Sequence, residues 1–174
     1  RGVLQRLVEW ESPLGRQVRL EFERLVLHSH QHIALVRCRI TPLNFEAPLT
    51  IVSAIDSRIR QSEHAEDDPR LGTQFKGDVL HLEAKGANSQ AAWILHRTQT
   101  TQFAVACGIQ HRIAPACEAE SYDDGRLFGF QFTVEGKPGV PITLDKFIAY
   151  VTGLDHPGQD LGSAVQDELG RAAG

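Results

Sequence analysis

The sequence predicts an all-β fold, namely a large antiparallel β-sandwich followed by one C-terminal helix. About nine to eleven segments carry strand patterns, separated by segments rich in turn residues. The period changes to that of a helix only after residue 160. Because no helices alternate with the strands, nothing would cover the faces of a parallel sheet. The strands are therefore expected to be antiparallel and to pack in two layers.

The composition is that of an ordinary globular domain. The chain has 174 residues, of which 41% are apolar and 23% charged, enough for one domain with a core. No apolar run approaches the ~20 residues of a membrane-spanning helix, and the first residues lack a secretory signal pattern. The net charge of -4 gives no electrostatic reason to expect nucleic acid. We therefore expect a cytoplasmic protein with neither membrane nor nucleic acid as partner.

Cysteine and methionine usage bears on the origin of the chain. Cys38, Cys107 and Cys117 are odd in number, and two of them lie in apolar strand patterns, so we expect reduced core thiols. The sequence contains no methionine and begins with Arg1, inside an expected strand. This start favours a fragment of a longer protein over a chain that lost only its initiator.

The first two strands are expected to form a hairpin. Apolar residues recur from Gly2 to Trp10, and the Ser-Pro-Leu-Gly segment at 12–15 supplies a turn. Every second residue from Val18 to Phe22 is apolar, with charged residues between. The pattern then shifts by one residue at 25–27, which a β-bulge or a fully buried strand end would explain.

The chain is organised around the next two strands. From Ala34 to Ile40 every second residue is apolar, the pattern of a half-buried strand. The run 49–55 carries apolar residues on both faces, so we expect it to be covered on both sides. Pro42 and Pro48 lack a backbone donor and mark strand ends, with the turn at 43–47 between the two runs.

A polar segment follows Asp56 and is too long, at about twenty residues, for an ordinary connection. Strand patterns resume at 79–83, 91–98 and 102–110. In the third of these, one face is expected to hold Phe103, Val105, Cys107 and Ile109, and the other Ala104, Ala106 and Gly108. The small residues predict the close approach of another layer.

The last part of the chain holds the strongest core pattern and the helix. An Asp-Gly turn at 124–125 precedes a strand that presents Phe128, Phe130, Phe132 and Val134 on one face. A final strand is expected at 142–151. Asp160 is a suitable N-cap for a helix whose apolar residues follow at helical spacing.

Two clusters have residue types that could carry chemistry. His28, His30 and His32 would project from one face of a continuous strand and could bind a metal. They lie where two strands must be joined, so no metal site is expected. A cluster of carboxylates, Glu118, Glu120, Asp123 and Asp124, could supply an acid and a base, but turn residues of this type are usually solvated.

The long polar segment is the better place for ligand contacts, because sandwich folds often display function on loops. Its candidates for a substrate-facing rim are Arg58, Arg60, Glu63, His64, Asp67, Asp68 and Arg70. A solvated acidic loop is the alternative. Trp10 and Trp93 could stack on sugar rings, although Trp93 precedes Ile94 and Leu95 and is expected in the core. No nucleophile motif or phosphate-binding glycine loop is present.

Several segments, taken in order, match one known family. They are WESPLG at 10–15, HIALVR at 32–37, TPLNF at 41–45, ID at 55–56, DPR at 68–70 and PITLDKFIAY at 141–150. Together they resemble the N-terminal domain of glycoside hydrolase family 65, which includes maltose, trehalose and kojibiose phosphorylases and related hydrolases. The resemblance covers nearly the whole chain, and its WxSPxG and TPLN segments are specific only in combination.

The resemblance implies a β-supersandwich, similar to galactose mutarotase, over 1–155 and truncated at its start. Residues 156–174 would begin a linker toward an (α/α)6 barrel outside the chain. The general acid and the phosphate site would belong to that barrel, so the resemblance assigns no catalytic residue and no cofactor here. It implies an α-linked disaccharide and inorganic phosphate as substrates of the longer protein, and a possible homodimer. Ser57 departs from the family's usual Asp-Gly at this point.

Three functions follow. The first is a non-catalytic N-terminal domain of a family 65-like phosphorylase or hydrolase, which supports the barrel and its active-site rim. The second is a stand-alone carbohydrate-binding module. The third is a sugar epimerase, which would need a histidine and a carboxylate in a concave sheet face, with His28, His81, His96 and His111 as candidates.

Overall fold

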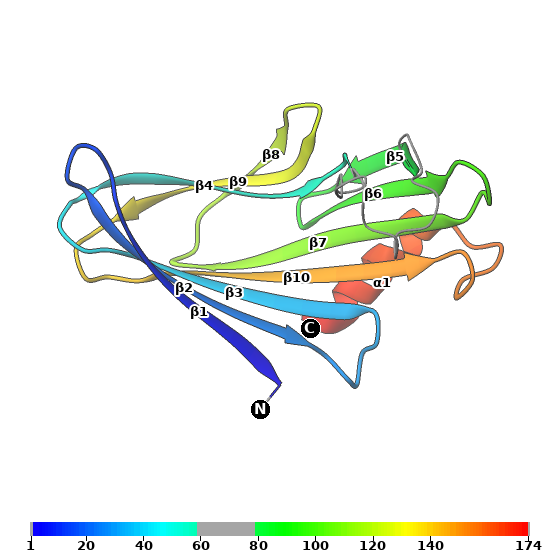
Figure 1. Cartoon of the computed structure of the whole chain (residues 1–174), viewed down its shortest axis with the longest axis horizontal. Helices are drawn as coiled ribbons and strands as arrows, with labels where there is room; N and C mark the ends of the chain where they lie inside the picture. Colours follow the sequence, from blue (N-terminus) through cyan, green and yellow to red (C-terminus); the bar gives the residue numbers. More distant parts are fainter. Residues whose placement is uncertain (1, 59–78, 174) are drawn as a thin grey trace, which may run out of the picture.

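Antiparallel strands build most of the computed structural model, which describes residues 2–58 and 79–173. Figure 1 shows a three-stranded sheet on one side of a large sheet and a helix on the other. The strands are β1 (Val3–Glu11), β2 (Gln17–Val26), β3 (Ile33–Pro42), β4 (Ala47–Asp56), β5 (Leu80–Ala87), β6 (Ala91–Thr98), β7 (Ala104–Ala114), β8 (Ala119–Asp123), β9 (Leu127–Gly136) and β10 (Ile142–Thr152). The helix is α1 (Leu161–Ala173).

The large sheet has the order β1-β2-β3-β10-β7-β6-β5, and the small sheet has the order β4-β9-β8. Every pairing is antiparallel. The predicted all-β sandwich with one C-terminal helix is therefore confirmed. No helix in the described ranges is long and apolar enough to cross a membrane.

The core between the two sheets rests on the phenylalanines of β9. Phe128, Phe130 and Phe132 are at most 7% exposed and pack against residues of β6, β7 and β10. We call the face of the large sheet that carries these partners the inner face, and the opposite face the outer face. The predicted phenylalanine core is confirmed, because alternate residues of β9 point to the same face of the small sheet.

The helix covers the outer face of the large sheet. Asp160 caps it, because its side chain accepts hydrogen bonds from the backbone N–H groups of Gly162 and Ser163 at 3.2 and 3.1 Å. Val165 and Leu169 are fully buried against β6, β7 and β10. The helix is thus a third layer of the fold. Whether it continues into a linker stays a prediction.

Small residues on β7 allow this layer to approach. A Cβ at Gly108 would lie 2.9 Å from side-chain carbons of both Val165 and Leu169. The predicted close approach on this face is confirmed. Phe103 does not belong to the strand as predicted: it precedes β7 and is 53% exposed. The reason is a turn at Gln102, which has a positive φ, so the strand begins only after Phe103.

The two central strands lie in different sheets. β3 pairs with β2 and β10, whereas β4 pairs with β9. Pro42 ends β3 and Pro48 lies at the start of β4, as predicted. The prediction that β4 is covered on both faces is wrong for the described chain. Val52 on its outward face is 42% exposed, because no described layer lies over the small sheet.

The small sheet covers only part of the inner face, because it has three strands against seven. The register places Phe22 opposite Cys38, and Cys38 opposite the core residue Leu144, so alternate residues of β1 and β2 belong to the inner face. Leu4, Trp10 and Val26 have this alternation and are 64%, 54% and 66% exposed. The apolar inner face therefore continues beyond the layer that covers it.

Candidate functional site

A cavity of about 320 Å³ lies between the sheets, beside the end of β4. Its lining comes from β4, β6, β7 and β10, that is from both sheets. The lining residues are Ala54, Ile55, Asp56, Ile94, His96, Val105, Cys107, Ile109, Lys146, Ile148 and Tyr150. Most of these are apolar and a few are polar, as in ligand sites, so the state of each polar group decides what the cavity can do.

Lys146 projects from β10 into this cavity. Its Nζ donates a hydrogen bond to the backbone oxygen of Ala54 at 2.9 Å, which joins the large sheet to the small one. Burial lowers the pKa of Lys146, because an ammonium group loses its hydration there. The hydrogen bond offsets part of that loss, so the side chain serves as a polar tie across the sandwich.

Cys107 and Tyr150 lie directly opposite each other on β7 and β10. Burial raises the pKa of the Cys107 thiol. The charge of a Cys107 thiolate, together with burial, raises the pKa of Tyr150 to about 12. Both groups are therefore protonated at neutral pH, and neither is an activated nucleophile.

His96 and Asp56 are the histidine and the carboxylate of this cavity. His96 is 2% exposed, and its Nε2 lies 2.8 Å from the backbone oxygen of Ser57, which can only accept. Arg126 donates from Nε to Asp56 Oδ2 at 2.9 Å, and this hydrogen bond lowers the pKa of Asp56. Asp56 and the Nε2–H group of His96 are thus each held by a structural partner, and the Arg126 hydrogen bond makes Asp56 a weak base.

His111 lies deeper between the sheets. Its Nε2 is 2.8 Å from Ser53 Oγ, and its ring meets Phe130 and Phe132 edge to face. Burial, with a smaller contribution from the charge of Lys146, lowers the pKa of His111 to about 3. The imidazole is therefore neutral over the whole physiological range. The sequence did not predict that His111 is buried, because alternation alone does not distinguish a histidine packed beside phenylalanines from an exposed one.

Most of the predicted rim residues cannot be placed. Arg58 is exposed and its backbone N–H donates to Asp56 Oδ1 at 3.0 Å. The other six lie outside the described residues, namely Arg60, Glu63, His64, Asp67, Asp68 and Arg70. The rim therefore stays a prediction.

Two members of the predicted carboxylate cluster, Asp123 and Asp124, lie at the turn between β8 and β9. Asp123 accepts a hydrogen bond from Lys85 Nζ, and Asp124 accepts from the backbone N–H groups of Arg126 and Leu127. These hydrogen bonds lower the pKa of both carboxyl groups. The two side chains stabilise the β8–β9 hairpin, and they do not form an acid and base pair.

The remaining candidates separate into core and surface. Trp93 packs under α1, as predicted, and Trp10 is exposed on the inner face of β1. His28 and His30 are exposed in the loop before β3, so the three histidines do not share a strand face. His32 alone turns toward α1, where it meets His156 and Glu168. Sequence reasoning missed the last two.

The chain matches the family model described as glycosyl hydrolase family 65, N-terminal domain, over residues 1–174. It is 31% identical over 174 residues to an alpha,alpha-trehalose phosphorylase of Thermoanaerobacter brockii, covering 99% of this chain and 22% of the relative. It is 26% identical to an uncharacterized glycosyl hydrolase of Mycobacterium leprae, over 86% of this chain and 19% of the relative. The chain thus spans about a fifth of the length of these curated relatives.

Among solved structures, a putative kojibiose phosphorylase from the human microbiome has a similar fold, with a TM-score of 0.77 at 12% identity. The match covers 98% of this chain and 21% of that one. At this identity the likeness concerns the fold alone, and it agrees with the predicted sandwich.

Proposed function

Because the chain belongs to glycosyl hydrolase family 65, as its N-terminal domain, we propose that it is a non-catalytic support domain of a longer α-glucoside phosphorylase or hydrolase. In this proposal the domain packs on a catalytic barrel of the same polypeptide. The relatives named as phosphorylases favour an α-linked disaccharide and inorganic phosphate as substrates of that longer protein. The free thiols favour a cytoplasmic setting.

The observation that carries this proposal is the uncovered part of the inner face. Leu4, Trp10 and Val26 expose apolar surface on the inner face, which also carries Arg6 and Arg24, whereas the outer face carries ion pairs beside the exposed Leu7. On that outer face, Arg19 pairs with Glu9 at 2.8 Å and Arg39 pairs with Glu21 at 3.3 Å. Several exposed large apolar side chains on one face of a sheet, with polar residues around them, are typical of an interaction surface. The inner face of β1 and β2 is therefore the side that meets the barrel.

The chemistry of the cavity supports the non-catalytic part. A sugar epimerase would need a histidine and a carboxylate that are free to exchange protons. In the cavity His96 donates through Nε2 to the backbone of Ser57, and the hydrogen bond from Arg126 lowers the pKa of Asp56, which makes it a weak base. We therefore rank an epimerase below a support domain. The arginine-rich segment after Asp56 remains our candidate for the rim of the barrel's active site.

The experiment is an assay of the purified chain with trehalose, kojibiose and maltose, with and without phosphate. We expect no glucose and no glucose phosphate, whereas the longer polypeptide that carries the chain should turn over one of these sugars. Turnover by the chain alone would contradict the support role. Turnover of none by the longer polypeptide would contradict the phosphorylase or hydrolase assignment.

A carbohydrate-binding module is the second candidate, and the exposure of Trp10 favours it, because exposed aromatic rings stack on sugars. Titration calorimetry of the chain with the same disaccharides distinguishes the two. The support role predicts no binding heat. Binding by the wild-type chain that disappears in Trp10→Ala would favour the module instead.

A further inference from the structure

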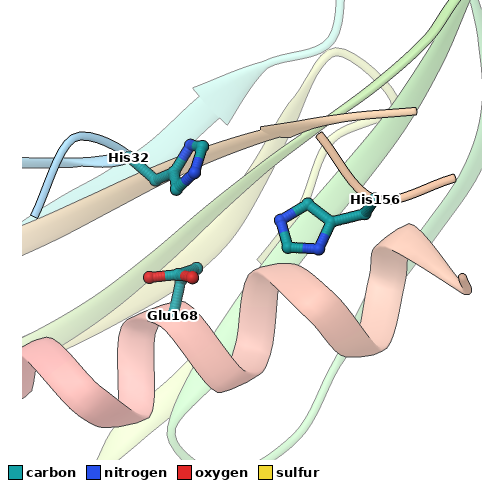
Figure 2. A group of neighbouring side chains, drawn as sticks. All are labelled: His32, His156 and Glu168. Atoms are coloured by element: carbon teal, nitrogen blue, oxygen red, sulfur yellow. The ribbon is translucent and has the colours of Figure 1, made fainter. Parts of the chain in front are cut away.

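Two histidines and a glutamate meet at the end of the outer face, away from the cavity. His32 immediately precedes β3, His156 lies in the loop between β10 and α1, and Glu168 belongs to α1. Figure 2 shows the three side chains directed into one space above the helix. One ligand atom from each lies within 4.8 Å of the others. Two imidazoles and a carboxylate are a common ligand set for zinc.

The polar groups of this cluster are poorly satisfied within the protein. Glu168 is 7% exposed, and its described ion pair is with Arg171 at 3.1 Å, whose side chain is 62% exposed. The Nε2 atom of His156 is buried and has no hydrogen-bond partner among the described residues. A buried carboxylate beside an imidazole nitrogen without a donor costs free energy, and a bound cation would satisfy both.

Each imidazole has a glutamine beside it. The amide nitrogen of Gln31 lies 3.2 Å from His32 Nε2, and the amide oxygen of Gln159 lies 3.1 Å from His156 Nδ1. The Gln159 oxygen accepts the proton of His156 Nδ1 and leaves His156 Nε2 unprotonated, whereas the Gln31 amide nitrogen donates to His32 Nε2.

The three segments are held in place by their backbones. Tyr150 N–H donates to the backbone oxygen of His32 at 3.0 Å, and His156 N–H donates to the backbone oxygen of Thr152 at 3.1 Å. Glu168 lies between Val165 and Leu169, which anchor α1 to the sheet. The ligand-bearing residues therefore come from fixed positions, as a metal site requires.

We propose that His32, His156 and Glu168 bind one divalent transition-metal ion, with Zn²⁺ as the best match to the ligand set. Ligand atoms around a tetrahedral zinc ion lie about 3.3 Å apart, so movements of about 1–2 Å at the side-chain ends complete the site. Water would fill the fourth position. The ion would join β3, the β10–α1 loop and α1, and so fix the helix on the sheet independently of any catalytic role.

The test is a titration of the chain, first freed of metal with a chelator, with Zn²⁺ by calorimetry and with Co²⁺ by visible absorption. We expect one ion per chain, the absorption bands of a four-coordinate Co²⁺ site, and a higher Tm with Zn²⁺. Glu168→Gln keeps the shape of the buried side chain, and His156→Ala removes a ligand. Each substitution is expected to weaken Zn²⁺ binding by about 10–100-fold.

Two matched controls separate this site from adventitious binding by surface groups. Asp167→Asn removes an exposed carboxylate one residue away on α1, and His30→Ala removes an exposed histidine of the same loop as His32. Both should bind Zn²⁺ as the wild-type chain does. The proposal is overturned by the absence of one-to-one binding up to about 1 mM Zn²⁺, or by unchanged affinity in Glu168→Gln. Should His156→Ala not fold, the Glu168→Gln titration decides alone.

Discussion

At the scale of single residues, two titratable groups buried between the sheets each have one protonation state and a hydrogen-bond partner. His111 is neutral and hydrogen-bonded to Ser53 Oγ at 2.8 Å, and Lys146 is tied to the backbone of Ala54. Both are close enough for the charge of Lys146 to disfavour a second positive charge on His111. Protonating His111 therefore requires hydration that the folded interior does not supply.

This arrangement predicts an acid-sensitive stability. The pKa of His111 falls from 6.5 to about 3 on folding, so the unfolded chain binds a proton that the folded chain rejects. The free energy of unfolding should therefore decrease as the pH falls from 6.5 toward 3, by up to about 1.4 kcal/mol per pH unit from this residue. Urea unfolding at several pH values measures the slope.

The comparison that isolates His111 is His111→Gln, which keeps a donor for Ser53 but does not titrate. Carboxylates also titrate in this window, so the difference between the wild-type and variant slopes is the quantity of interest. His30→Gln, in an exposed position, controls for the loss of a histidine as such. Equal slopes in wild type and His111→Gln would show that His111 accepts a proton in the folded protein.

At the scale of elements, the contact between β7 and α1 depends on the absence of a side chain at Gly108. A Cβ there would lie 2.9 Å from Val165 and from Leu169, both anchors of the helix. Gly108→Val should lower the free energy of unfolding by about 1–3 kcal/mol through overpacking. Gly170, on the exposed side of the same helix, has nothing within 4 Å of its Cβ position.

Gly170→Ala is the matched control and should raise the free energy of unfolding by up to about 1 kcal/mol, because alanine favours the helix. Chemical denaturation of the two variants gives opposite signs if α1 is packed as described. A neutral effect of Gly108→Val would mean that the helix does not rest on β7.

The elements themselves were largely predictable, because each carries a local signal. Alternation located the strands, and Asp160 located the helix start. The order of the strands was not predictable, since β10 enters between β3 and β7, far from both in sequence. Periodicity describes which face a residue occupies and contains no information about which strand lies beside it.

The His32, His156 and Glu168 cluster shows the same limit of local patterns. Glu168 follows Ala164 and Val165 at helical spacing, so a glutamate on an apolar helix face was already a signal in the sequence. Its partners could not be identified, because His32 and His156 meet it only through the pairing of β3 with β10. Among the polar residues of the cavity, His96 was a predicted candidate, whereas Lys146 and Tyr150 escaped detection for the same reason.

At the scale of the whole molecule, the unequal layers define where a partner can pack. The triple variant Leu4→Ser, Trp10→Ser and Val26→Ser should leave the unfolding free energy of the chain within about 0.5 kcal/mol per site, because these side chains are exposed. In the longer polypeptide it should weaken the contact between this domain and the barrel. Trp10 alone is expected to contribute about 2 kcal/mol or more.

Val52→Ser is the control, because Val52 is apolar and 42% exposed on the far side of the small sheet. Limited proteolysis between the domains, and the Tm of the longer polypeptide, report the contact. If the triple variant and Val52→Ser behave alike in the longer polypeptide, the inner face of β1 and β2 is not the docking surface.

The central position of β10 also constrains how the polypeptide folds during its synthesis. β1, β2 and β3 can form as successive hairpins, but they are joined to β7, β6 and β5 only through β10, the last strand made. Until β10 leaves the ribosome, the edges of β3 and β7 stay unpaired and prone to association. The large sheet can therefore be completed only after β10 has been made, so its two halves share their stability only at that late stage.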